Sequence, residues 1–496
     1  MAQSTMESGY VGNLDPMQEK KLQQLWKILL QSWNVEIAAL ESDQASSISP
    51  QSGSKKSRRV FSVSRSPVPP TETELARIPA NLLATLETLG AGPVELKAVG
   101  SLLVKVPGDK LRSAFLTLLR QDHPDAFLLR FLRAEKWDVP KAWIKFVASL
   151  YWRSFEYRID EEVLSKGEEY NWLRSQEEAD TVSKKDGQSF MHQLKVGKGY
   201  LHGCDRAGRP ICFVRVRTHY AGQQTQKGLF DYIMQGIETA RLLQVPPVES
   251  MAILFDLTGF GISNWVNKAV FYNYVPFFFF PCTDDELQDF PPVKFIVETF
   301  QNYYPESLGA MIFYNPPWIF SGFWKIISGI LDPVVASKVH SISGPKELEK
   351  LVPRSQILKE FGGEEDWEFQ YIEPSPMENE RMEDTATRDL ILSERQELGD
   401  KLFSLTAQWI TQTNHESTLP RRNEVISSLR ENYWKLDPYV RARNYLDRTG
   451  VIGEGGKIEF YPRKVSAQAD EKSIAMTESV AEQPAAAAAA ISVTTA

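Results

Sequence analysis

Residues 316–338 carry apolar and small side chains in a helical pattern. Successive residues of an α-helix are rotated by roughly 100°, so the large apolar side chains fall on one broad arc: Ile319, Phe320, Phe323, Trp324, Ile326, Ile327, Ile330 and Leu331. The other side holds small residues and one lysine, Lys325. Such a helix either is an ordinary buried crossover or is a movable gate over a lipid pocket, and periodicity does not separate the two. We refer to residues 316–338 as the gate segment.

Short runs rich in β-branched and aromatic residues precede the gate segment, at residues 211–216, 252–257 and 311–314. Helical patterns over residues 229–243 and 293–304 separate these runs. Strands and helices that alternate at this spacing predict an α/β fold with a parallel sheet and crossover helices. The gate segment is the next crossover in the series, so we expect it to lie over the sheet.

Helical patterns also fill much of the remaining chain. They cover residues 17–40, 78–103, 111–120, 125–134, a stretch that restarts at Asp138, 387–413 and 423–445. Residues 41–75 are rich in Ser, Gln and Pro with a basic run, and residues 463–496 contain a run of alanines. The first segment has too few apolar residues to offset chain entropy, so we expect a disordered linker. The second is of low complexity, so we expect a disordered tail.

Composition and charge narrow the class of protein. An apolar content of 42% describes a globular chain, and a net charge of -8 argues against a nucleic-acid partner. No window approaches the roughly 20 apolar residues that span a bilayer, and the polar start does not resemble a signal peptide. Cys204, Cys212 and Cys282 have no metal-type spacing and cannot all pair, which indicates reduced thiols. We expect a cytoplasmic monomer that contacts membranes peripherally.

The motifs of common catalytic sites do not occur in the sequence. Gly197, Gly199 and Gly203 lack the spacing of a dinucleotide loop, and Arg206, Gly208 and Pro210 predict a turn that leads into the strand at Ile211. There is no phosphate loop, nucleophile elbow or zinc-protease helix. We therefore expect no enzyme activity, no catalytic residues, no metal site and no cofactor.

Two features at strand ends carry candidate chemistry. His219 and Tyr220 follow the first strand and are either axial ligands of a haem or an aromatic pair at a strand end. Asp256 ends the second strand, where α/β proteins place functional groups. A carboxylate without a base or metal partner more often caps a turn, here the one at Thr258 and Gly259.

The chain resembles the CRAL-TRIO lipid-binding family, and within it the fungal phosphatidylinositol-transfer branch. The resemblance is carried by the turn DRAGRP, the strand AILFDLTGFG, the run QNYYPESLG and the segment FSGFWKIISGILDPVVASK, and it covers residues 109–363. It implies a helical N-terminal lobe followed by a CRAL-TRIO fold, in which a mainly parallel sheet floors a hydrophobic pocket closed by a gate helix. The flanks GNLDPMQEKKLQQLW and LRENYWKLDPYVRARNYLDRTGV resemble those of a longer fungal subfamily.

The resemblance also implies a site for one phospholipid. The headgroup would contact Lys136 and Lys325, with Ser321 beside them, and the gate and pocket would use Phe320, Phe323, Trp324, Ile327, Ile330 and Leu331. Glu135 stands where the family usually has arginine, and Gly322 where the branch has threonine. A carboxylate beside a phosphate would repel it, and a missing hydroxyl removes a hydrogen bond. These two departures weaken the expected phosphatidylinositol site. The resemblance still favours phosphatidylinositol, and another lipid stays an alternative.

Residues 266–288 depart from the family pattern, because deleting these 23 residues joins GISNW to DFPPVKF. We interpret them as an insertion, with the hypothesis that they are a translated intron, which a cDNA containing these codons would refute. The expected organisation is then as follows: an N-terminal helical extension (1–40), a linker (41–75), the helical lobe (76–180), the lipid-binding domain (181–363), a C-terminal helical extension (364–462) and a tail (463–496).

The expected function is that of a lipid-transfer or lipid-presenting protein. It would extract one phospholipid from a membrane into the gated pocket. One alternative is a carrier or sensor of another apolar ligand, such as a sterol, squalene or haem. A second is an adaptor whose C-terminal helices, residues 387–445, recruit a lipid kinase or another partner.

Overall fold

The sheet of this protein follows the predicted order of strands. The computed structural model describes residues 8–35, 37, 75–220, 222–259, 291–318, 320, 324, 328, 333–411 and 418–462. In this part of the chain, five strands form one sheet in the order of the sequence: β1 (Gly199–Cys204), β2 (Pro210–Arg215), β3 (Met251–Asp256), β4 (Leu308–Tyr314) and β5 (Val339–Ile342). β2 to β5 run parallel to their neighbours, and β1 is antiparallel to β2. The three predicted parallel strands are confirmed.

Two strands were not predicted. The turn predicted at Arg206, Gly208 and Pro210 is confirmed, but the stretch before it, Gly199–Cys204, is the edge strand β1, paired with β2. Backbone hydrogen bonds hold this strand despite its glycines, and the turn DRAGRP is confined to the residues that follow. There the carboxylate of Asp205 accepts hydrogen bonds from the backbone N–H groups of Ala207 and Arg209. β5 is too short to give a pattern of its own.

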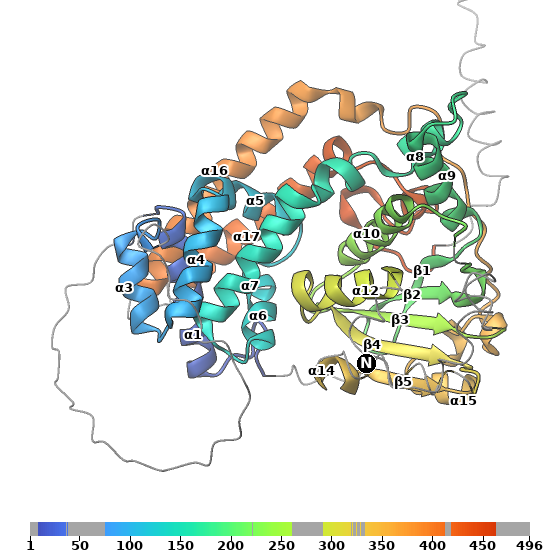
Figure 1. Ribbon diagram of the computed structural model, residues 1–496, viewed down its shortest axis with the longest axis horizontal. Helices are drawn as coiled ribbons and strands as arrows, with labels where there is room; N and C mark the ends of the chain where they lie inside the picture. The colour runs from blue at the N-terminus through green and yellow to red at the C-terminus, as the bar shows by residue number, and fades with distance from the viewer. Residues whose placement is uncertain are drawn as a thin grey trace, which may run out of the picture.

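The two faces of the sheet serve different purposes. Alternate side chains such as Phe213 and Leu254 pack on the segment that contains α15 (Pro345–Leu348) and continues to Phe361. The other alternate side chains, such as Ile253, face α10 (Gln226–Leu242). Figure 1 shows α8 (Gly167–Ser175), α9 (Val182–Lys195), α10 and α12 (Pro291–Glu298) gathered on one side of the strands. We call this group of helices and strands the sheet lobe.

Helices from both ends of the chain form a second group, the helical lobe (Figure 1). Its members are α1 (Pro16–Ser32), α3 (Ala80–Thr88), α4 (Pro93–Lys105), α5 (Gly108–Leu119), α6 (Pro124–Ala134), α7 (Val139–Tyr151), α16 (Thr385–Thr411) and α17 (Thr418–Val440). The expectation that the first helix continues to residue 40 is wrong. It ends at Ser32, because Asn34 turns the chain with a left-handed φ of 58°. The predicted linker and tail lie mostly outside the described residues.

One buried carboxylate joins four helices of the helical lobe. Asp125 of α6 accepts hydrogen bonds from the indole of Trp26 in α1 at 2.7 Å and from the guanidinium of Arg422 in α17 at 2.5 and 2.6 Å. Arg422 also donates to the hydroxyl of Thr406 in α16 at 2.8 Å. Burial alone would raise the pKa of Asp125, but the charge of Arg422 lowers it to about 2. The C-terminal helices are therefore an integral part of the helical lobe.

A second buried carboxylate joins the two lobes. Glu238 of α10 is fully buried and pairs with Arg120 at 2.7 Å, Arg153 at 2.9 Å and Arg241 at 3.1 Å. The hydroxyl of Tyr304 also donates to it. Burial opposes ionisation of this carboxyl, but the arginine charges hold its pKa well below the usual range. Because Arg120 and Arg153 follow α5 and α7, this cluster connects the helical lobe to the sheet lobe.

Replacing Arg422 with leucine tests the four-helix junction. The change leaves Asp125 buried without its partner, so we expect a loss of about 3 to 5 kcal/mol in unfolding free energy at pH 7. The pKa of Asp125 is depressed in the folded state, so its pairing stabilises the protein above pH 4 and loses this effect as the pH falls toward 2. The difference between wild type and Arg422→Leu should therefore shrink in acid. Denaturant titration measures it, with the exposed neighbour Arg421→Leu as the control; equal stability of both variants would refute the assignment.

Candidate functional site

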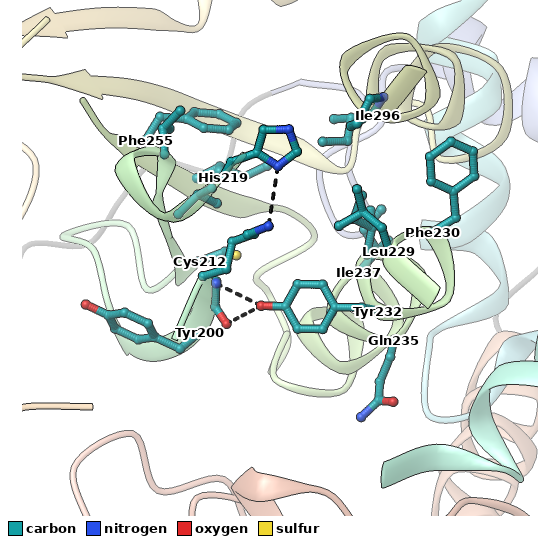
Figure 2. Close-up of a pocket in the computed structure, with 18 of the residues that line it drawn as sticks. Tyr200, Cys212, His219, Leu229, Phe230, Tyr232, Gln235, Ile237, Phe255 and Ile296 are labelled. Atoms are coloured by element: carbon teal, nitrogen blue, oxygen red, sulfur yellow. Dashed lines mark hydrogen bonds between the residues drawn. The ribbon is translucent and has the colours of Figure 1, made fainter. Parts of the chain in front are cut away.

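A cavity of about 510 Å³ lies between the sheet, α10 and α12. Its wall is mostly apolar. The sheet contributes Leu201, Cys212, Val214, Met251, Ile253, Phe255, Met311 and Phe313, and the helical side contributes Leu229, Phe230, Ile233, Ile237, Val293, Ile296, Val297 and Phe300. Figure 2 shows Leu229, Phe230 and Ile237 opposite Phe255 and Cys212. Since side chains alternate along a strand, one face of each strand lines the cavity while the other is sealed in the core.

Local sequence positions these walls. α10 begins at Gln226 because the hydroxyl of Thr225 accepts a hydrogen bond from the backbone N–H of Gly228 at 3.1 Å. At the other wall, Asp256 ends β3 and accepts a hydrogen bond from the backbone N–H of Thr258 at 3.0 Å, as expected of a capping residue. Asp256 also pairs with Arg217, which the sequence did not indicate.

The gate segment reaches the cavity through Phe320. This side chain is 6% exposed, lines the cavity, and lies 4.7 Å from Phe313 between ring centroids. Trp324 lies 5.5 Å from the same ring. Phe320, Trp324 and Ser328 are helical, and the segment continues into α14 (Pro333–Ser337). The other predicted residues of this segment lie outside the described residues: Ser321, Phe323, Lys325, Ile327, Ile330 and Leu331.

Lys136 does not line the cavity. It is an exposed residue after the last turn of α6, in the helical lobe, with a left-handed φ of 52°. Its neighbour Glu135 pairs with Lys145 at 2.8 Å, so this carboxylate is already neutralised by a lysine. Because Lys325 lies outside the described residues, the expected pairing of Lys136 with Lys325 around a headgroup stays a prediction.

His219 and Tyr220 take different positions. His219 lines the cavity, and its Nδ1 lies 3.3 Å from Nζ of Lys198 (Figure 2). Burial, reinforced by the charge of Lys198, lowers the pKa of His219 to about 4, so the imidazole is neutral at pH 7. Tyr220 does not line the cavity and is 42% exposed. The described residues include no cluster of three or more His, Cys, Asp or Glu side chains that fits a metal ion.

Several polar residues of the cavity wall were missed in the sequence. They are Glu168, Lys198, Gln224, Tyr232 and Gln235. The Tyr232 hydroxyl donates to the carbonyl of Gly199 at 2.6 Å and accepts from its N–H at 2.8 Å, so it ties α10 to the edge strand (Figure 2). One signal in the sequence could have identified this polar part of the wall: Lys198 is a charged residue directly before a buried strand.

The C-terminal extension closes one end of the cavity. Phe369, Asn444, Tyr445 and Leu446 belong to its lining. This end is anchored by Glu168 of α8, which is 2% exposed and pairs with Arg448 at the end of α18 (Tyr445–Arg448).

Further hydrogen bonds complete this anchor. Glu168 also accepts from the hydroxyl of Tyr371 at 2.9 Å and from the backbone N–H of Tyr445 at 3.1 Å. Arg448 has a second carboxylate partner, Glu378, at 2.9 Å. Burial raises the pKa of Glu168, and the partners supply the donors that keep its oxygens hydrogen-bonded. Residues far beyond the sheet therefore form part of the site.

Comparison with known proteins agrees with this architecture. The family model described as "CRAL/TRIO domain" matches residues 194–274 and 282–363, and the model described as "CRAL/TRIO, N-terminal domain" matches residues 80–148. The chain is 31% identical over 471 residues to "Phosphatidylinositol transfer protein CSR1" of Eremothecium gossypii, a match that covers 90% of this chain and 99% of that protein. The chain belongs to the CRAL-TRIO family. It is also 31% identical over 460 residues to a "CRAL-TRIO domain-containing protein" of Schizosaccharomyces pombe, with 90% of this chain and 92% of that protein covered.

Membership of the CRAL-TRIO family confirms the expected fold class. The match to the CRAL-TRIO model is interrupted at residues 275–281, inside the predicted insertion of residues 266–288. This insertion lies outside the described residues and stays a prediction. None of the described helices is long and apolar enough to cross a bilayer.

Replacing Arg448 with methionine tests the anchor of the C-terminal wall. The variant leaves Glu168 buried without its cationic partner, which costs about 3 to 5 kcal/mol. We expect faster amide hydrogen exchange in residues 442–448 and weaker retention of any bound ligand. Mass spectrometry after hydrogen exchange measures the first effect, and the exposed Lys457→Met is the control. Unchanged exchange in Arg448→Met would show that this end of the cavity is held by other contacts.

Proposed function

We propose that this protein extracts one phospholipid, phosphatidylinositol favoured, from a membrane into its cavity and transfers it to, or presents it at, another site. The observation that carries the proposal is the apolar cavity between the sheet and α10, bordered by Phe320 of the gate segment. A volume of about 510 Å³ falls within the range of about 300–1,000 Å³ that is usual for ligand sites. The Eremothecium gossypii relative is named as a phosphatidylinositol transfer protein, which supports the choice of ligand.

The energetics of desorption explain why such a cavity is useful. Pulling a two-chain lipid out of a bilayer exposes on the order of 30 methylenes at about 0.8 kcal/mol each, a cost of more than about 20 kcal/mol. A cavity walled by aliphatic and aromatic side chains offsets most of this cost. Exchange then requires that the gate segment open where its apolar face meets the membrane, so that neither state exposes that face to water.

A second candidate function is a carrier or sensor of another apolar ligand, such as a sterol, squalene or haem. The neutral imidazole of His219 in the cavity favours haem within this class, since neutral histidine is a common iron ligand. Tyr220 does not support the haem alternative, because this residue lies outside the cavity lining. A Soret band in the purified protein would identify haem, and mass spectrometry of the co-purified ligand distinguishes the remaining lipids.

Substitution of Gly236 tests whether the cavity holds the ligand. Gly236 lies on α10 in the cavity wall, and a Cβ atom added there would meet no other atom within 4 Å. Gly236→Trp should fill the cavity and remove most of the co-purified lipid and the transfer activity, measured by lipid mass spectrometry and transfer between vesicles. Gly236→Ala is the control, because it also removes the helical glycine, a gain of about 1 kcal/mol in helix propensity, but adds little volume. Full lipid loading of the Gly236→Trp variant would refute the proposal.

Membrane contact is tested at Trp318, at the start of the gate segment. Its side chain is 88% exposed, and tryptophan partitions well into the interfacial region of a bilayer. We expect Trp318→Ala to weaken binding to phospholipid vesicles by roughly tenfold, as measured by sedimentation. The control is Leu390→Ala, which removes a 72% exposed apolar side chain from α16 in the helical lobe. Equal vesicle binding by both variants would contradict a membrane role for this end of the gate segment.

A further inference from the structure

Among the described residues that line the cavity, Lys198 is a buried cation. Lys198 directly precedes β1, is 6% exposed, and is part of the cavity lining. Its backbone is fixed on both sides, because its N–H donates to the carbonyl of Gln193 at 3.0 Å and its carbonyl accepts from the N–H of Arg215 at 2.8 Å. The side chain therefore starts from a rigid point at the base of an otherwise apolar wall.

The hydrogen-bond partners of Lys198 are neutral. Its Nζ donates to Oε1 of Gln224 at 3.3 Å and lies 3.3 Å from Nδ1 of His219. Lysine is a donor only, so the neutral imidazole accepts at Nδ1. An ammonium has three N–H groups. The contacts with Gln224 and His219, both long at 3.3 Å, use two of these donors.

The part of the cavity wall that the structure describes supplies no free carboxylate to neutralise the charge of Lys198. Among the described lining residues the acidic one is Glu168, and it is engaged by Arg448 and Tyr371. Burial lowers the pKa of Lys198 to about 8. The amine is therefore protonated in most molecules at pH 7. A buried charge without a counter-ion is unfavourable unless a ligand supplies one.

We propose that Lys198 binds an anionic oxygen group on an otherwise apolar ligand, either the phosphate of a phospholipid or the carboxylate of a fatty acid. The apolar wall takes the hydrocarbon part, while the ammonium of Lys198, set between Gln224 and His219, takes the charged part. This inference rests on the proposed function, and it adds a headgroup contact in the sheet lobe to the one expected at Lys136 and Lys325. Lys136 lies outside the cavity lining, whereas Lys198 belongs to it.

The test compares two probes that differ only in the charged group. The full chain is stripped of co-purified lipid and titrated with cis-parinaric acid and with its methyl ester, and binding is followed by probe fluorescence. We expect wild type to prefer the acid by about tenfold to a hundredfold, the size of a hydrogen bond to a charged group. Lys198→Met should lose this preference and keep its affinity for the ester, and Lys198→Arg should retain part of the preference. Lys185→Met, which removes an exposed lysine paired with Asp180, should behave as wild type.

The outcomes separate the inference from the proposed function. Equal affinity of wild type for acid and ester, or an equal loss of both in Lys198→Met, overturns the role of Lys198 while leaving the apolar cavity as the ligand site. Failure of wild type to bind either probe, with no lipid co-purified, overturns the proposed function itself.

Transfer of fluorescent phosphatidylinositol between phosphatidylcholine vesicles identifies the source of the anion. A tenfold or greater reduction in Lys198→Met supports a phosphate ligand. Unchanged transfer, together with a lost preference for the acid probe, supports a carboxylate ligand.

Discussion

The ion cluster around Glu238 fixes the helix that forms the helical side of the cavity. Protein interiors are normally close-packed, and side chains that line an unfilled space give up the dispersion contacts they would otherwise make. The cavity wall must therefore be stabilised by contacts on the side that faces away from the cavity. Ile237 and Thr239 line the cavity, and the residue between them, Glu238, points to the arginines that follow α5 and α7. The lining of α10 is in this way secured by the helical lobe rather than by the cavity contents.

A similar arrangement holds the opposite end. Glu168 is buried beside the cavity and gathers Arg448, Tyr371 and the backbone of Tyr445. Asp125 does the same inside the helical lobe, where it secures the two long C-terminal helices. Each of these carboxylates brings together segments that are far apart in the chain. A cavity with an apolar wall needs such contacts, because the apolar core alone would collapse onto the space.

Local patterns in the sequence predicted the parts of the fold that depend on nearby residues. Strands β2, β3 and β4 and most helices follow from hydrophobic periodicity, and the family motifs placed Phe320 at the pocket. The edge strand β1 was missed because its glycines interrupt any strand pattern, and its structure depends on pairing with β2. The burial of Lys198 and the pairing of Glu168 with Arg448 result from long-range packing, which no local pattern records. Lys136 was expected in the site by resemblance alone, and the structure places it in the helical lobe, outside the cavity lining.

The position of Tyr445 and Leu446 in the cavity wall has a consequence for biosynthesis. The ribosome delivers the sheet and α10 long before it delivers these two residues. If the sheet folds first, the cavity of the nascent chain is open at the end near Glu168, because its partner Arg448 has not yet been synthesised. The cavity can enclose a ligand at this end only after this segment has been synthesised. Until then its apolar wall is an open surface that chaperones or membranes can cover.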